Sequence, residues 1–587
     1  MPALTTTSDG FLLHGEPFRI ISGALHYFRV HPGLWSDRLR KARLMGLNTV
    51  ETYIPWNHHQ PEPGGPLVLD GFLDLPRFLR LARDEGLRVL LRPGPFICAE
   101  WDGGGLPDWL TSDPDIRLRT SDPRFTGAVD RYLDLLLPAL RSHMATAGGP
   151  VIAVQVENEY GAYGDDSAYL KHLADAFRSR GVEELLFTCD QGDPEHLAAG
   201  SLPGVLVTGT FGSRVEQSLA RLREHRPEDP LFCAEFWIGW FDHWGGPHHV
   251  RDAADAAADL DRLLSAGASV NIYMFHGGTN FGFTNGANHK HAYTPTVTSY
   301  DYDAALTECG DPGPKYHAFR EVIARHAAVP EEPVPAPGPK LSPTSVELSS
   351  RAPLLPFAGL ATAVRTDAPV TMDELGQRTG YALYRTTLPA GGDGVLRFAR
   401  SVGDRAQVFV DGAPVGVLES ERHDESLPAR VPRPGATLEV LVENMGGVNY
   451  GPRIGAPKGL LGPVSFNDTE LTGWDCSPLP LDDLGTVPFA PAAAAPVTVP
   501  AFHRGTFDVG TPADAFLSLP GWSKGQAWIN GFHLGRYWNR GPQRTLYVPA
   551  PVLRPGSNEL VLLELHGTTA TRALLTDAPD LGPENTW

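Results

Sequence analysis

Glutamates stand at the ends of two apolar stretches of this sequence, where paired carboxyl groups could do acid and base chemistry. Glu157 and Glu159 follow the apolar run 151–156, and Glu235 closes the run 231–235. Hydrolysis of a glycosidic bond needs one acid that protonates the leaving oxygen and one carboxylate that acts at the anomeric carbon. A single glutamate at such a position is more often an ion-pair partner. Spacing alone does not decide whether Glu157 or Glu159 partners Glu235.

Further polar and aromatic residues stand close to the ends of similar runs, and they suit a sugar. Flat aromatic faces match the C–H surface of a pyranose, and polar side chains match its hydroxyl groups. The residues concerned are Tyr53, Glu100, Asn158, Trp237, Tyr300 and Tyr302. Together with the glutamates they favour a carbohydrate site over a purely structural role.

Elements that alternate between strand and helix must position these residues. Eight short apolar runs of β type are separated by stretches of helical period, and glycines such as Gly46 and Gly267 end the helices just before the next run. The runs cover residues 19–24, 49–53, 88–91, 151–156, 185–189, 205–209, 231–235 and 269–275. Eight such units without a GxGxxG or P-loop motif predict a (β/α)8 TIM barrel over residues 1–329, with its active site at the carboxyl ends of the strands.

The rest of the chain is predicted to be all-β. Proline-rich linkers at 330–345 and 487–500 separate a first β-sandwich module, 346–486, from a second β-sandwich or jelly-roll module, 501–587. Both modules carry a hairpin signal, Asp411-Gly412 in the first and Asn530-Gly531 in the second. We expect the modules to support the barrel, with at most a secondary role at the rim of the site.

Composition excludes several other classes of function. The 587 residues carry a formal net charge of −20, which disfavours nucleic acid and anionic membranes as partners. No apolar stretch is long enough to span a bilayer and no signal peptide is evident, so we expect a cytoplasmic protein. Five scattered cysteines form no disulfide framework. The histidine pairs 248–249 and 289/291 do not occupy the barrel positions of a metal-dependent amidohydrolase, so we expect no metal and no cofactor.

Several segments give the chain a specific resemblance to glycoside hydrolase family 35, the β-galactosidases. The matching segments are ETYIPWNHHQPEPG, LRPGPFICAEWDGGGLPDWL, VIAVQVENEYGAYG, CAEFWIGWFDHWGG, YMFHGGTNFGFTNGAN, TSYDYDA and WSKGQAWINGFHLGRYWN. They span the barrel and the last module, whereas the region from about 345 to 490 resembles the family only loosely.

This resemblance implies a role for each residue of the site. It implies a retaining double displacement with Glu159 as acid/base and Glu235 as nucleophile. It further implies that Asn158 holds the sugar 2-hydroxyl, that Tyr53 and the Cys98-Ala99-Glu100 segment hold the 3- and 4-hydroxyls, and that Tyr300 and Tyr302 border the site. Glu100 is our candidate for the axial 4-hydroxyl. Two departures from the family, Trp237 and Phe283, are expected to alter the pocket rim.

The expected function is therefore that of an exo-β-galactosidase that removes terminal galactose from oligosaccharides or glycoconjugates. A β-galactoside is then the substrate and galactose the product, and a homodimer is compatible with the sequence. Another exo-β-glycosidase, such as a glucosaminidase, is the alternative among enzymes, because a barrel and two carboxylates do not name the sugar. An inactive carbohydrate-binding protein is the alternative from another class. The preferred linkage stays open.

Overall fold

A closed barrel of eight parallel strands forms the N-terminal half of the computed structural model, which describes residues 2–357, 363–400, 402–492 and 497–586. The strands pair in sequence order around the barrel, which closes where β12 pairs with β4. They are β4 (Ile21–Leu25), β5 (Thr49–Tyr53), β6 (Arg88–Arg92), β7 (Val151–Gln155), β8 (Leu185–Gln191), β9 (Leu206–Thr210), β10 (Phe232–Trp237) and β12 (Ser269–His276). The predicted TIM barrel is confirmed.

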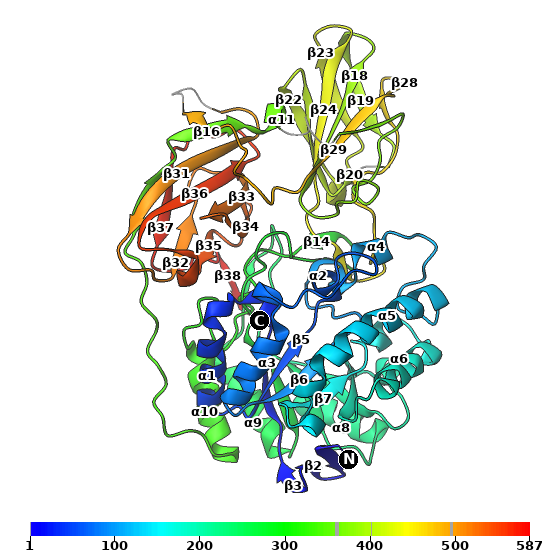
Figure 1. Ribbon diagram of the computed structural model, residues 1–587, viewed down its shortest axis with the longest axis vertical. Coiled ribbons are helices and arrows are strands. Elements are labelled where there is room, and N and C mark those ends of the chain that lie inside the picture. The colour runs from blue at the N-terminus through cyan, green and yellow to red at the C-terminus, as the bar shows by residue number, and fades with distance from the viewer. Residues whose placement is uncertain (1, 358–362, 401, 493–496, 587) are drawn as a thin grey trace.

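Helices surround the barrel in the lower half of Figure 1 and bury its outer face. The principal ones are α1 (Trp35–Met45), α3 (Leu75–Asp84), α5 (Pro123–Leu140), α6 (Ser167–Ser179), α7 (Pro194–Gly200), α8 (Val215–His225), α9 (Ala253–Ser265) and α10 (Pro314–His326). Helix α1 ends at Gly46, whose φ of 103° is accessible to glycine at little cost. The three-stranded sheet of β1 (Leu4–Thr7), β2 (Gly10–Leu13) and β3 (Glu16–Phe18) packs on the amino ends of the strands, away from the candidate site.

The first β-module is a sandwich of two antiparallel sheets, at the upper right of Figure 1. One sheet contains β17 (Val364–Thr366), β29 (Trp474–Leu479), β18 (Tyr381–Leu388), β24 (Ala436–Glu443), β21 (Arg405–Val410) and β22 (Ala413–Glu419). The facing sheet contains β23 (Ser426–Val431), β19 (Gly392–Phe398), β27 (Val464–Phe466) and β28 (Thr469–Glu470). Its core is apolar and separate from that of the barrel. The hairpin predicted at Asp411-Gly412 joins β21 and β22.

The second β-module is built from segments that are not continuous in the sequence. Its larger sheet contains β30 (Ala490–Pro491), β16 (Ser350–Pro353), β31 (Ala501–Val509), β36 (Gly556–Glu564), β33 (Lys524–Ile529) and β34 (Phe532–Trp538). Its smaller sheet contains β15 (Thr344–Glu347), β37 (Arg572–Thr576), β32 (Ala515–Ser518) and β35 (Thr545–Val548). The segment that holds β15 and β16 was expected at the start of the first module, and it pairs instead with the second.

The path of the chain after α10 explains why β15 and β16 belong to the second module. The chain from 327 to 343 runs extended along the side of the barrel to the second module at the upper left of Figure 1, and only then enters the first module. The second predicted linker, 487–500, returns the chain to the second module, and its residues 493–496 lie outside the described residues. The hairpin predicted at Asn530-Gly531 joins β33 and β34.

Short strands attach both modules to the barrel. In the loop that follows β12 of the barrel, β13 (Ala287–His289) pairs with β14 (Tyr293–Pro295). The same strand pairs in parallel with β25 (Val448–Tyr450) of the first module. Near the C-terminus, β38 (Glu584–Thr586) pairs with β11 (His248–Val250) of the barrel. Within the described ranges, no helix is both long and apolar enough to cross a membrane.

Candidate active site

A pocket opens at the carboxyl ends of the barrel strands and collects most of the residues that the sequence indicated. Nine of them line it, namely Tyr53, Cys98, Ala99, Glu100, Asn158, Glu159, Glu235, Trp237 and Tyr302. They come from the ends of β5, β6, β7 and β10 and from the loop after β12. The tenth, Tyr300, is buried behind the wall of the pocket. The strand-end positions thus meet around one cavity, as a TIM barrel requires.

Glu235 is surrounded by hydrogen-bond donors. Its Oε1 accepts from the Tyr53 hydroxyl at 2.7 Å and from the Arg92 guanidinium at 2.6 Å. Its Oε2 accepts from the Trp237 indole nitrogen at 3.1 Å. Three donors, one of them charged, suit a carboxylate, because hydrogen bonds between charged partners are shorter and stronger than neutral ones. The arrangement fits a nucleophile that waits in its anionic form.

Glu159 has the opposite surroundings. Burial, and then the negative charges of Glu235 and Asp190, raise the pKa of its carboxyl from 4.5 to about 8. Its nearest polar partners, the Gln191 amide and the Thr210 hydroxyl, are both 3.4 Å from Oε1 and therefore stabilise the anion weakly. Glu159 is thus protonated at neutral pH while Glu235 accepts from three donors, which is the division of labour expected of an acid and a nucleophile.

The geometry also distinguishes Glu159 from Glu157. Arg119 binds both carboxylate oxygens of Glu157, at 2.9 and 2.8 Å, and the Tyr169 hydroxyl donates to it at 3.0 Å. Glu157 is almost completely buried and does not line the pocket. It is a structural ion-pair partner, the role that a lone strand-end glutamate most often has.

Asn158, between these two glutamates, lines the pocket with its orientation set by two donors. Its Oδ1 accepts from Arg92 at 2.6 Å and from Gln155 at 3.0 Å, and it lies 3.1 Å from the Tyr53 hydroxyl, whose one proton goes to Glu235. Because the amide oxygen is occupied in this way, the amide nitrogen is the group available to a sugar hydroxyl.

Glu100 also lines the pocket and is anchored at both oxygens. The Tyr300 hydroxyl donates to Oε2 at 2.6 Å, and the Asn449 amide donates to Oε1 at 3.3 Å. Burial raises the pKa of this carboxyl to about 7, against the lowering effects of Tyr300 and the Arg29 charge. Cys98, Ala99 and Glu100 all have left-handed backbone angles, with φ of 56°, 54° and 48°.

Tyr300 binds Glu100 and is not among the residues that line the pocket. It therefore contributes to the site through Glu100 rather than as part of the pocket border.

The first β-module supplies part of the pocket wall, which differs from the expected role at the rim. Tyr450 of β25 lines the cavity, and the Gln191 amide lies 3.5 Å from its hydroxyl. Asn449 is completely buried and contacts both Glu100 and the Cys98 sulfur. Pairing of β25 with β13 carries these two side chains to the site.

Sequence reasoning missed several other lining residues. Gln191 ends β8, so the strand-end rule could have found it, whereas Tyr273 lies within β12. Trp240, Phe241 and Lys290 lie in loops without such a signal. Phe283, expected at the rim, instead packs against Tyr381 and His533 where the barrel meets the two modules.

One of the two histidine pairs is held by a carboxylate. His248 and His249 both bond Asp242, at 2.7 and 2.9 Å. In the described part of the chain, no group of three or more His, Cys, Asp or Glu side chains is placed to hold a metal ion.

Comparison with known proteins agrees with this geometry. The sequence model of glycosyl hydrolases family 35 matches residues 10–326, and models of the β-galactosidase first all-β domain and galactose-binding domain match 369–480 and 500–558. The chain is 46% identical to a mouse β-galactosidase-1-like protein (95% of this chain, 88% of that one) and 43% identical to a Xanthomonas manihotis β-galactosidase (95% and 92%). It is 42% identical to human β-galactosidase (98% and 88%). The chain therefore belongs to glycosyl hydrolases family 35 and is a glycoside hydrolase.

Proposed function

We propose that this protein is a retaining exo-β-galactosidase that releases terminal β-galactose from oligosaccharides or glycoconjugates. The observation that carries the proposal is the pair of carboxyl groups with opposite environments in one pocket, Glu159 protonated and Glu235 held by three donors. The β-galactosidases to which the chain is similar over nearly its whole length support the choice of sugar.

In the first step, the Glu235 carboxylate attacks the anomeric carbon while Glu159 gives its proton to the glycosidic oxygen. The bond between the anomeric carbon and that oxygen breaks, and the leaving group departs as a neutral alcohol. A galactosyl ester on Glu235 with α configuration remains. Proton donation by Glu159 avoids the expulsion of an alkoxide.

In the second step, Glu159, now a carboxylate, removes a proton from water. The water oxygen attacks the anomeric carbon, the ester bond to Glu235 breaks, and β-galactose leaves. Both carboxyl groups return to their starting states. Two inversions give overall retention, which requires the two groups to lie about 5 to 5.5 Å apart.

Recognition of galactose is assigned to Glu100 and Asn158. The Glu100 oxygens are fixed by Tyr300 and Asn449, so a carboxylate is available to accept from the axial 4-hydroxyl. Glucose has its 4-hydroxyl equatorial and would leave this acceptor unpaired, which a buried site penalises strongly. Asn158 presents its amide nitrogen to the 2-hydroxyl.

A panel of nitrophenyl glycosides tests the sugar, and NMR of the first-formed product tests the stereochemistry. We expect the β-galactoside to be preferred over the β-glucoside and the β-N-acetylglucosaminide, and β-galactose to appear first. First-formed α-galactose would contradict both catalytic assignments. Binding of galactose without turnover of any glycoside would indicate a carbohydrate-binding protein instead.

A further inference from the structure

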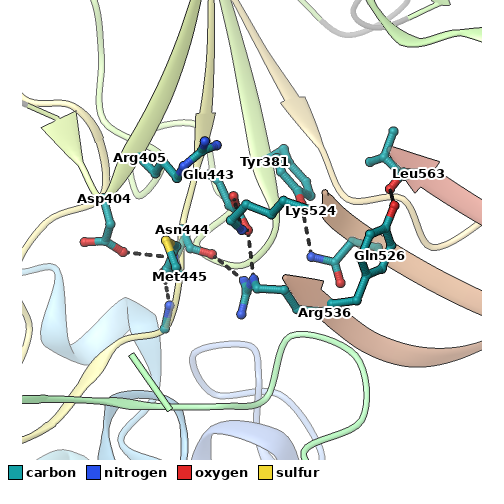
Figure 2. A network of polar contacts seen from close by, with 12 residues as sticks. Tyr381, Asp404, Arg405, Glu443, Asn444, Met445, Lys524, Gln526, Arg536 and Leu563 are labelled. Carbon is teal, nitrogen blue, oxygen red and sulfur yellow. Dashed lines mark hydrogen bonds and ion pairs between the residues drawn. The ribbon is translucent and has the colours of Figure 1, made fainter. Parts of the chain in front are cut away.

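Arg536 connects all three domains of the chain at a buried junction above the pocket. Its Nε donates to Glu443 of the first module at 2.8 Å, and its Nη2 donates to the Asn444 carbonyl at 3.0 Å. Figure 2 shows both contacts, with Lys524 beside the same glutamate. Lys524 binds the two oxygens of Glu443 at 2.6 and 2.7 Å. We call Glu443, Lys524 and Arg536 the module junction.

The third donor of Arg536 reaches the barrel. Nη1 donates to the Asn285 Oδ1 at 2.8 Å, and the Asn285 amide in turn donates to the Met445 carbonyl at 2.8 Å. The next residue, Gly286, donates its backbone N–H to the Glu100 carbonyl at 2.8 Å. Asn285, which accepts from Arg536, and Gly286, which donates to the Glu100 backbone, are therefore neighbours in the chain.

The atoms around Gly286 are packed so closely that the segment cannot shift without moving its neighbours. A Cβ atom at this glycine would lie 2.6 Å from the Asn449 Oδ1 and 2.6 Å from the Trp101 carbonyl oxygen. The segments that carry Glu100, Asn285 and Asn449 are also joined through the backbone, since Ala287 donates its N–H to the Gly447 carbonyl at 3.0 Å. A shift of one must move the others.

Arg536 also controls the second support of Glu100. The Asn444 and Met445 carbonyls, held by Arg536 and Asn285, lie at the end of β24. The chain then enters β25, where Asn449 donates to the Glu100 carboxylate at 3.3 Å. Both the backbone and the carboxylate of Glu100 therefore depend on contacts that converge on Arg536.

We propose that Arg536 of the second module, acting through Asn285, is a positioning residue that sets the galactose preference of the pocket by fixing Glu100 and Asn449. The inference rests on the proposed role of Glu100 in recognising the axial hydroxyl. Arginine is required because its planar fork serves Glu443, Asn285 and Asn444 at once, whereas a lysine ammonium cannot hold all three directions. The second module is thereby a part of the specificity machinery, although none of its described residues lines the pocket.

Two variants interrupt the connection at different points. Arg536→Lys keeps the positive charge beside Glu443 and removes the fork, and Asn285→Ala leaves the module junction itself intact. Tyr381→Phe is the matched control, because it removes the hydrogen bond from Gln526 at 3.0 Å, which joins the same two modules and involves no barrel residue, while the ring that packs on Phe283 stays. Figure 2 shows this contact beside the junction.

We expect both test variants to weaken galactose binding in calorimetry by about tenfold and to lower the ratio of kcat/KM for nitrophenyl β-galactoside over β-glucoside by a similar factor, because a misplaced charged acceptor loses most of its hydrogen bond. Amide hydrogen exchange should rise in residues 98–104 and 444–450. The control should keep the wild-type dissociation constant, ratio and exchange in these segments.

Unchanged binding and unchanged ratio in both test variants would overturn the inference, and so would an equal loss in Tyr381→Phe. Amide exchange separates this failure from a failure of the proposed function. If the wild-type protein hydrolyses no galactoside, the proposed function is wrong, and unchanged exchange in residues 98–104 of both test variants would then refute the positioning role on its own.

Discussion

Replacement of Glu159 by glutamine separates the chemical role of this residue from its effect on stability. Its pKa rises from 4.5 to about 8 through burial and the charges of Glu235 and Asp190. A carboxyl group with a higher pKa in the folded than in the unfolded chain binds its proton more tightly when folded. The free energy of unfolding therefore falls as the pH rises from 4.5 through about 8, and below 4.5 this group has no effect on it.

The size of the effect follows from the shift. One pKa unit corresponds to about 1.4 kcal/mol, so ionisation of Glu159 lowers the free energy of unfolding by a value on the order of 5 kcal/mol. Glutamine carries no charge at any pH. We expect Glu159→Gln to unfold at the wild-type temperature at pH 4 and several degrees above it at pH 9, as measured by calorimetric scans.

Activity should change in the opposite direction. Loss of the general acid should reduce kcat by roughly 10²- to 10⁴-fold for a substrate such as lactose, whose leaving group is a sugar hydroxyl that needs a proton. A dinitrophenyl galactoside, which needs no protonation to leave, should form the glycosyl enzyme at nearly the wild-type rate. Equal losses with both leaving groups, or a thermal gain that does not depend on pH, would refute the assignment of Glu159.

Glu157→Gln is the control for this experiment. It breaks a buried bidentate pair with Arg119, which costs about 3 to 5 kcal/mol of stability. The variant should unfold at a lower temperature, and the remaining folded enzyme should treat both leaving groups as wild type does. A leaving-group effect like that of Glu159→Gln would mean that the two glutamates have been assigned in the wrong order.

Three further predictions concern the pocket. Glu235→Gly should be nearly inactive and should yield α-galactosyl azide when azide is supplied with an activated galactoside, detectable by NMR, whereas the β-azide would contradict a nucleophile at this position. Glu100→Gln should lower kcat/KM for the galactoside about tenfold with a smaller loss for the glucoside, because a neutral amide replaces a carboxyl group that is partly ionised near neutral pH; equal losses would assign Glu100 to support of the fold. Exhaustive dialysis against EDTA should leave the rate unchanged, and a loss restored by one divalent ion would reopen the question of a metal.

Much of the architecture was predictable because its signals are local. Strand and helix periods are written within windows of ten to twenty residues, and the turn pairs Asp411-Gly412 and Asn530-Gly531 adopt the positive φ angles that such hairpins need. The barrel rule then places every strand end at one mouth. These local signals predicted one mouth for the carboxylates that follow β6, β7 and β10, and Glu100, Glu159 and Glu235 do line one pocket. The preference for Glu159 over Glu157 came from the family resemblance.

The assignment of strands to the β-modules was not local. Residues of β15 and β16 read as the start of the first module because they follow the linker directly. They pair with β37 and β31 instead. Strand pairing depends on which edge is free in the folded molecule, and sequence order carries little information about it.

The choice between Glu157 and Glu159 shows the same limit within the site. The run of β7 ends at Gln155, and both glutamates have left-handed backbone angles, so the strand period no longer says which way either side chain points. Arg119, from a distant loop, neutralises one of them, and the charge of Glu235 acts on the other.

What the sequence by itself determined was therefore the barrel, its strand ends and the chemistry they could carry. Tertiary structure decided which carboxyl group is protonated and what holds Glu100, since Asn449 lies 349 residues away in the chain. Residue types and local periods set secondary structure. Burial and charge at a site depend on every segment that packs there, and only the folded chain brings those segments together.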